Sequence, residues 1–264
     1  SHPNNFTGKT LQLDNYRLND FGPRVVHSEK SNVRVVLGFR GELSSGWDYD
    51  TAYVFNEELS DNTVFNRVSA SAFDALLQAG LYNPFNGGGV YQTGFVSHNP
   101  VDYTPGGIGP AIVDAYRANE RTMTTLDFRM SKPDIFSVRG GDVGMAFGLE
   151  TRNETFMDDR DPRLDGTIVF TERRTNGQLS TSAGDTFPYV SDLANSSPTP
   201  DSDGSRNVNS VYLEFDVPLV SPEMNIPVVE QFDLQLAYRN EAYSDFEGTG
   251  VPRIAFGWVV NDIL

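Results

Sequence analysis

Two short acidic segments, residues 158–161 and 201–204, carry the side chains best suited to binding a metal ion. Their carboxylates stand at alternate positions, and Ca²⁺ prefers hard oxygen ligands in such an arrangement. Neither segment completes the loop of roughly twelve residues with a closing Glu that binds Ca²⁺ in many proteins. Solvated loop charge is therefore the favoured interpretation, and calcium binding is the alternative. The candidate ligands would be Asp158, Asp159, Asp161, Asp201 and Asp203.

The sequence carries no recognisable catalytic motif. The three histidines, His2, His27 and His98, show no metal-ligand spacing such as HExxH. Neither the nucleophile motif GxSxG nor the dinucleotide-binding motif GxGxxG occurs. The absence of cysteine removes Cys-ligated zinc and thiol nucleophiles. A Ser–His–Asp triad assembled by the fold stays open, but the sequence favours a protein that is not an enzyme and uses no cofactor.

The chain is acidic, with 36 Asp and Glu against 20 Lys and Arg and a formal net charge of −16. Nucleic-acid binding requires clustered Lys and Arg, so this balance argues against a nucleic-acid partner. The charge is usual for soluble proteins, and the sharper interpretation is a set of acidic loops that face a charged exterior. No apolar run reaches the roughly 18 residues of a transmembrane helix.

Apolar and polar residues alternate with a period of two through most of the chain, which is the pattern of β-strands. The pattern predicts about eight strands, most of them near the roughly 9–11 residues that cross a bilayer. A soluble β-sandwich also alternates and remains the alternative. The expected strands lie at residues 16–27, 33–43, 47–56, 125–130, 143–152, 210–219, 232–239 and 253–260.

The two faces of these strands differ in a way that favours a membrane barrel. Aromatic residues near the strand ends would form an interfacial girdle on the outer face, and charged residues beside Gly and Ala would suit a wet lumen. The residues expected to point outward include Trp47, Phe147, Leu213, Leu236 and Phe256. The residues expected to point into the lumen, as ligand-contacting candidates, are Arg34, Arg40, Arg129, Glu150, Arg152, Glu214 and Arg239.

The connections alternate between short and long. Outer-membrane barrels have short periplasmic turns and long extracellular loops, whereas long structureless loops are uncommon in compact soluble domains. We therefore expect an all-β fold: an antiparallel transmembrane β-barrel segment with long extracellular loops. The expected short connections are 44–46, 133–141 and 221–230, with 28–32 as a short exception at the opposite end. The expected long loops are 59–121 and 155–207, with helices at 68–79 and 111–118.

Several segments resemble TonB-dependent receptors of the bacterial outer membrane. Each match is short, but their order agrees with the family and they span nearly the whole chain. The matching segments, in chain order, are residues 20–24 (DFGPR), 34–43 (RVVLGFRGEL), 46–53 (GWDYDTAY), 82–86 (YNPFN), 141–154 (GDVGMAFGLETRNE), 211–219 (VYLEFDVPL) and 236–246 (LAYRNEAYSDF).

The resemblance implies that residues 1–264 are part of a receptor barrel in the bacterial outer membrane. Family members carry a plug domain and a TonB-contacting segment before a barrel of roughly 22 strands. Neither part is recognisable here, so we expect an internal barrel segment: a proteolytic product, an expressed fragment or one piece of a split receptor. A segment with two open strand edges needs further strands in lipid.

Two functions follow from the resemblance as expectations. The first is a receptor that takes up a small ligand, with TonB acting through the absent plug. Its partners would be membrane lipid, the plug and remaining strands of the same receptor, and the imported ligand. The lumen residues would then contact ligand or plug. The second is a surface-exposed binding or assembly protein built on a receptor-like barrel. A plug encoded upstream in the parent gene would favour the first.

Overall fold

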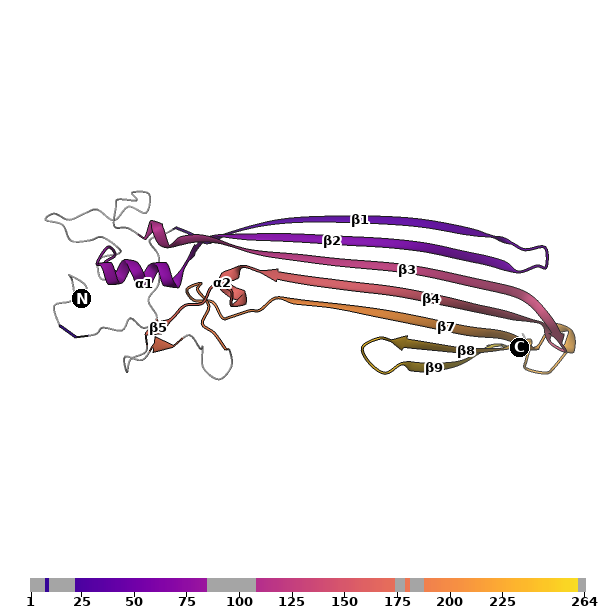
Figure 1. Cartoon of the computed structure of the whole chain (residues 1–264). Helices are drawn as coiled ribbons and strands as arrows, with labels where there is room; N and C mark the ends of the chain where they lie inside the picture. Colours follow the sequence, from indigo (N-terminus) through magenta and orange to yellow (C-terminus); the bar gives the residue numbers. More distant parts are fainter. Residues whose placement is uncertain (1–7, 10–21, 85–107, 174–178, 181–187, 261–264) are drawn as a thin grey trace. The chain divides into compact units, whose positions relative to one another are not determined.

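The computed structural model describes residues 8–9, 22–84, 108–173, 179–180 and 188–260 (Figure 1). The chain is all-β, with a seven-stranded antiparallel sheet in the order β1-β2-β3-β4-β7-β8-β9 and a separate pair β5-β6. The strands are β1 Val25–Glu42, β2 Asp48–Val68, β3 Ile112–Val138, β4 Gly141–Arg160, β5 Glu172–Arg173, β6 Leu179–Ser180, β7 Ser202–Val220, β8 Gln231–Tyr243 and β9 Thr249–Val259. The helices are α1 Ala70–Ala79 and α2 Pro162–Asp165, with short 3-10 turns η2 Gly109–Ala111 and η3 Pro222–Met224.

The chain divides into two compact units, which are described separately below. Unit 1 comprises Ser1–Lys30, Leu59–Asn119 and Met157–Ser202. Unit 2 comprises Ser31–Glu58, Glu120–Phe156 and Asp203–Leu264. No helix in the described part of the chain is long and apolar enough to cross a membrane.

The strands of unit 2 separate apolar from polar residues onto two faces, as the alternation predicts. Directly opposed residues of neighbouring antiparallel strands share a face. Leu236 of β8 is opposed by Phe215 of β7 on one side and by Ile254 of β9 on the other. On the other face, Arg239 is opposed by Tyr212 of β7. The predicted faces are therefore confirmed for this part of the sheet.

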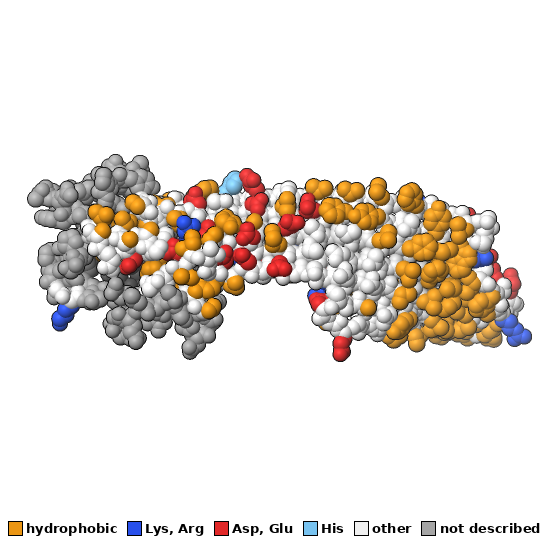
Figure 2. All heavy atoms as spheres, in the orientation of Figure 1, with side chains coloured by type: hydrophobic (Ala, Val, Ile, Leu, Met, Phe, Trp, Pro, Cys, Tyr) orange, Lys and Arg blue, Asp and Glu red, His pale blue; other side chains and the backbone are white. Residues whose placement is uncertain are grey.

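The apolar face of unit 2 is exposed. Trp47 and Phe128 both contact Phe147, with ring centroids 6.0 and 6.4 Å apart, so the three rings lie on one face. At the other edge of the sheet, Ile254 and Phe256 are each 72% exposed. Figure 2 shows hydrophobic side chains gathered in a broad patch over the part of the sheet near the short turns. No described residue covers this patch, so a folded chain leaves a large apolar surface in contact with its surroundings.

Gly140 fills a tight turn between β3 and β4. A Cβ atom at this position would lie 2.3 Å from the carbonyl oxygen of Pro218 in β7 and 2.6 Å from the carbonyl carbon of Leu219. Both atoms belong to the backbone, so relieving the clash requires the turn and the strand to move apart. Only glycine fits this close approach.

We therefore expect Gly140→Ala to destabilise the protein by about 1–3 kcal/mol, the usual cost of forcing extra atoms into a packed site. Gly144→Ala is the matched control, because a Cβ atom there would have its nearest neighbour at 3.7 Å. Urea unfolding of the two variants in lipid vesicles measures the difference. Equal stabilities of the two variants would contradict the close approach.

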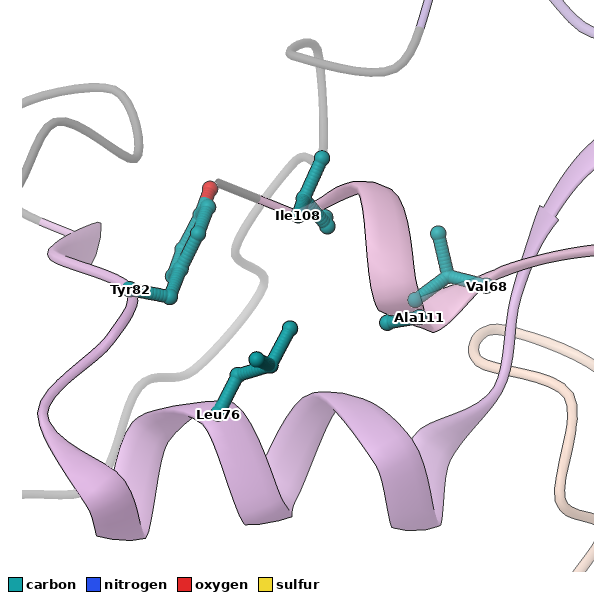
Figure 3. Close-up of a cluster of buried hydrophobic side chains, with 5 residues drawn as sticks. All are labelled: Val68, Leu76, Tyr82, Ile108 and Ala111. Atoms are coloured by element: carbon teal, nitrogen blue, oxygen red, sulfur yellow. The ribbon is translucent and has the colours of Figure 1, made fainter. Parts of the chain in front are cut away.

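Unit 1 has a small hydrophobic core around α1 (Figure 3). The helix begins at Ala70 because the Ser69 side chain accepts a hydrogen bond from the Ala72 amide, and it ends where Gly80 takes a left-handed φ of 72°. Leu76 points from the helix into the cluster, which also contains Val68, Tyr82, Ile108 and Ala111. The predicted helix at 68–79 is thus confirmed, except that it begins at Ala70 and not at Val68.

Several predicted strand boundaries were wrong because the strands extend beyond the segments in which apolar and polar residues alternate. The described part of the expected strand 16–27 starts only at Val25 and belongs to β1, and the expected connection 28–32 lies inside that strand. Residues 112–118 begin β3 and do not form a helix. Every residue of β1 from Val25 to Arg40 is exposed. The first residues of the strand do not keep their apolar side chains on one face. Residues 25–32 (VVHSEKSN) show no alternation of apolar and polar side chains, so this end of the strand carries no periodic signal.

The loops change accordingly. The two long connections are residues 69–111 and 161–201, and both are shorter than predicted. The short turns 43–47 and 221–230 agree with the prediction, whereas the predicted connection 133–141 shrinks to residues 139–140 because β3 continues to Val138. The sheet is not closed into a barrel, and β1 and β9 are its outer strands. The count of seven long strands replaces the expected eight, since the weakest one merges with β1.

Candidate functional site

The polar face of unit 2 forms a groove that contains two of the predicted lumen residues. Arg40 of β1 and Arg129 of β3 line a concavity of about 640 Å³, together with Asp50 and Tyr212. The Arg129 guanidinium also approaches the nearly buried Asp127 carboxylate at 3.4 Å. The groove therefore presents cations, anions and tyrosine rings to whatever enters it.

Other predicted lumen residues form a ladder of ion pairs and hydrogen bonds. Arg152 lies between two carboxylates of its own strand, Glu150 at 3.6 Å and Glu154 at 2.8 Å. Arg239 donates to Glu241 at 2.7 Å. These ion pairs restrain the side chains, although the buried Arg152 Nε atom has no hydrogen-bond partner in the described part of the chain.

Two further lumen candidates behave differently from the ladder. Glu214 accepts a hydrogen bond from the Gln235 amide, which joins β7 to β8 on the polar face. Arg34 is exposed on β1, and among the described residues it makes no ion pair. The structure distributes the seven lumen candidates over the sheet and does not gather all of them into one pocket.

A second concavity, of about 450 Å³, lies on unit 2 between β2, β3, β4, β7 and the β8–β9 turn. It contains Glu58, Arg121, Phe156 and Arg206. Asp245 from the turn holds Arg206 by hydrogen bonds of 2.8 to 3.0 Å. The sequence analysis missed these residues because it assigned them to loops or turns, and recognising longer strands is the signal that would have found them.

An aromatic pair borders this second concavity. The Arg206 guanidinium lies 5.1 Å from the centre of the Phe246 ring, and that ring stacks on Tyr243 with centroids 4.0 Å apart. The Arg206–Phe246 distance suits a cation–π interaction. Arg206 of β7 and the β8–β9 turn therefore present a cation, a carboxylate and a ring within a few ångströms.

Three of the five calcium candidates, Asp158, Asp161 and Asp201, already have protein partners. Asp158 accepts two hydrogen bonds of 2.8 Å from Arg117, and this guanidinium holds the pKa of the Asp158 carboxyl below its usual value. Asp161 is 2% exposed and caps α2, and Asp201 accepts a hydrogen bond from the Arg160 amide. Within residues 22–84, 108–173 and 188–260, no cluster of three or more acidic or histidine side chains is arranged to hold a metal ion.

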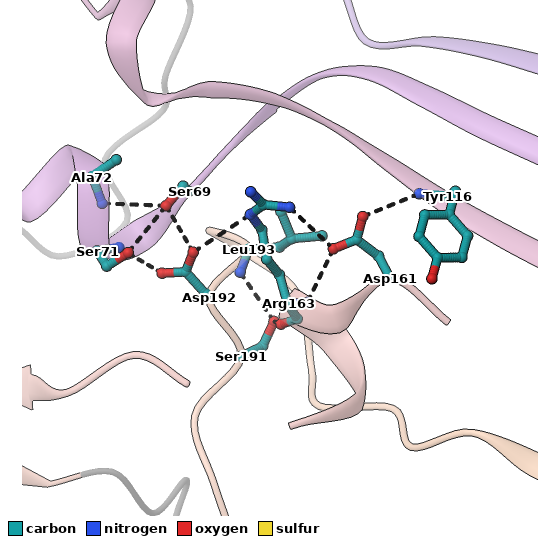
Figure 4. A network of polar contacts seen from close by, with 9 residues as sticks. All are labelled: Ser69, Ser71, Ala72, Tyr116, Asp161, Arg163, Ser191, Asp192 and Leu193. Atoms are coloured by element: carbon teal, nitrogen blue, oxygen red, sulfur yellow. Dashed lines mark hydrogen bonds and ion pairs between the residues drawn. The ribbon is translucent and has the colours of Figure 1, made fainter. Parts of the chain in front are cut away.

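Unit 1 contains a buried polar network that the sequence did not reveal (Figure 4). Asp192 is 1% exposed and accepts hydrogen bonds of 2.7 Å from the Ser69 hydroxyl and the Ser71 amide, at the start of α1. Arg163 lies between this carboxylate, at 3.7 Å, and Asp161, at 3.4 Å. The network joins α1, α2 and the segment around Asp192 into one structure.

The side chains at these sites can form ion pairs and hydrogen bonds with a bound molecule. Comparisons with known proteins found no matching family model, no similar curated protein and no similar solved structure. A function for this chain therefore has to be argued from its own residues and their geometry.

Proposed function

We propose that the chain forms part of the barrel wall of a TonB-dependent receptor in the bacterial outer membrane. The receptor takes up a ligand across that membrane and is not an enzyme. One observation carries the proposal: a single sheet has an uncovered apolar face and an opposite face lined by charged side chains. A lipid bilayer on one side and a wet lumen on the other account for both faces.

The apolar face supports a lipid contact more than a soluble fold. In a soluble sandwich the apolar faces of two sheets cover each other, whereas the described part of this chain provides no second layer. Ile254, Phe256 and Trp258 are 56 to 72% exposed on a strand without Asp or Glu. An aqueous exterior would make such a surface prone to aggregation.

Strand length and connectivity support the same proposal. The shortest long strand, β9, has 11 residues, and β3 has 27, whereas crossing a bilayer takes about 9–11. In the antiparallel order of the sheet, the turns 43–47, 139–140 and 221–230 fall at one end of the strands. The long connections 69–111 and 161–201 fall at the other, as in outer-membrane barrels.

The open edges of β1 and β9 imply further strands. Unpaired backbone groups are costly in lipid, so both edges need partners there. In this proposal the remaining strands and the plug of the same receptor supply them, and TonB acts through that plug. The lumen charges, including Arg40, Arg152 and Arg239, then contact plug or ligand.

The alternative is a surface-exposed binding or assembly protein on the same kind of barrel. The long connections favour it equally, because loops on a rigid scaffold commonly carry recognition. A plug-coding segment in the parent gene would favour the receptor. Its absence from that gene would favour the alternative.

Single-cysteine labelling tests the membrane topology cleanly, because the chain has no cysteine of its own. Ser197 and Ser45 are exposed serines in the second long connection and in the β1–β2 turn. We expect a membrane-impermeant maleimide to label Ser197→Cys on intact cells. It should label the matched variant Ser45→Cys only after the outer membrane is permeabilised. Labelling of Ser45→Cys alone on intact cells would reverse the orientation, and equal labelling of both would refute a membrane-spanning sheet.

A further inference from the structure

The second concavity of unit 2 holds one cation and one anion that have no partner in the described part of the chain. Of its charged side chains, Arg206 binds Asp245, and Glu154 binds Arg152 at 2.8 Å. Glu58 and Arg121 form neither an ion pair nor a hydrogen bond with any residue in the described part of the chain. Both side chains are exposed. The concavity therefore offers a free carboxylate and a free guanidinium to a ligand.

The same concavity has an apolar surface. Phe156 lies over Gly204, where a Cβ atom would come within 2.5 Å of the ring, so the glycine leaves room for the ring to lie against the strand. The Phe156 ring is nevertheless 47% exposed, although it shares its concavity with mostly polar side chains. Met123 adds a second apolar side chain. An exposed ring of this kind is a platform for an apolar or aromatic group of a ligand.

The balance of charge indicates the class of ligand. Asp245 neutralises Arg206, whereas Glu154 shares Arg152 with Glu150, so the paired groups leave the lining slightly acidic. The two free groups are of opposite sign. A polyanion or a polycation would meet one attractive group and one repulsive group, which disfavours both classes. A zwitterion places its carboxylate on a guanidinium, in the bidentate geometry that arginine favours, and its ammonium on a carboxylate. A volume of about 450 Å³ falls in the range of small-ligand sites.

We propose that Arg121, Glu58 and Phe156 form a subsite for a short zwitterionic peptide with an aromatic side chain. Arg121 binds the terminal carboxylate, Glu58 binds the terminal ammonium, and Phe156 stacks on the aromatic side chain. This inference rests on the proposed function, because it names the class of ligand that the receptor takes up. It assigns roles to three residues that lie at or beyond the ends of the alternating sequence segments.

Titration calorimetry on the full receptor, purified from outer membranes, tests the subsite with the tripeptide Phe-Gly-Gly. We expect the free tripeptide to bind, and we expect N-acetylation or C-amidation to weaken binding about tenfold or more, since a hydrogen bond to a charged group is lost. Arg121→Gln should weaken the binding of the free tripeptide by a similar factor, and this variant should bind the free and the amidated forms equally. Glu58→Gln should lose discrimination against the acetylated form. Phe156→Ala should weaken the binding of the free, acetylated and amidated tripeptides alike.

Arg139→Gln is the matched control, because Arg139 is another exposed arginine without an ion pair in the described chain and lies in the β3–β4 turn, outside the concavity. This variant should bind like the unaltered protein. Equal binding of free and capped tripeptides, or no binding at millimolar concentration, would overturn the inference. Those outcomes leave the outer-membrane proposal standing if Ser197→Cys is still labelled from outside, whereas failed labelling with intact binding would overturn the topology alone.

Discussion

Phe147→Arg is expected to destabilise the protein in a lipid bilayer by about 2–4 kcal/mol, the cost measured for a basic side chain on the lipid face near the middle of a membrane. Phe147 lies on β4 on the apolar face and contacts the rings of Trp47 and Phe128. The substitution removes both ring contacts and, in the proposed membrane barrel, places a guanidinium among hydrocarbon chains. Unfolding by urea in lipid vesicles, followed by tryptophan fluorescence, measures the loss.

Glu150→Gln is the control for this prediction. Glu150 lies on the same strand three residues later, at a position of opposite parity, so it points to the polar face. Its ion pair with Arg152 at 3.6 Å is partly exposed, and such pairs contribute at most about 1 kcal/mol. We therefore expect a small change. Similar losses in the two variants would mean that the two faces meet similar surroundings, which is incompatible with a bilayer on one of them.

The alternation of residues was sufficient to predict the sheet and its two faces. The core of each strand of the seven-stranded sheet was found, because a strand buried or lipid-covered on one face must place apolar residues at every second position. The short strands β5 and β6 were missed. The strand ends were missed for the same reason. β2 continues from Asn56 to Val68 and β3 starts at Ile112, where no single face is apolar over the whole length.

The error at the strand ends also concealed part of the candidate site. Arg121 and Phe156 fell within predicted loops, so their place on a common surface could not be deduced. Contacts such as that of the Phe156 ring with Gly204 join positions that are far apart in the sequence, and no local pattern encodes them. The residues that the alternation did assign, such as Arg40 and Arg129, were found together in a groove.

The buried network of unit 1 could not be predicted from the sequence, for a further reason. Arg163 stands in a segment rich in acids and arginines, and Asp192 is the one charged residue of segment 188–200; both residue types are ordinarily solvated. Only the fold decides which carboxylate is enclosed. Asp192 is enclosed because it accepts the Ser71 amide at the start of α1, where the first turn of a helix leaves its amides without partners.

Asp192→Ala should give the largest local effect in unit 1. Removing one member of a buried ion pair costs about 3–5 kcal/mol, because the remaining charge is left in a poorly solvated place. Here the Arg163 guanidinium would keep only Asp161, and the Ser69 hydroxyl and Ser71 amide would lose their acceptor. We expect the effect in the opening of α1, since the network holds its first turn.

Hydrogen exchange of the α1 amides in the full protein measures this opening. A loss of about 3 kcal/mol corresponds to an exchange rate more than a hundredfold faster where local opening controls exchange. The exchange rate in Asp192→Asn should fall between those of the unaltered protein and Asp192→Ala. The asparagine keeps an oxygen acceptor for the Ser71 amide but removes the charge that faces Arg163. Asp74→Ala is the matched control: Asp74 is an acid on the same helix, partly exposed, with one long hydrogen bond of 3.5 Å to Gln78. If Asp74→Ala accelerated exchange as much as Asp192→Ala, the stability of α1 would not depend on the buried network.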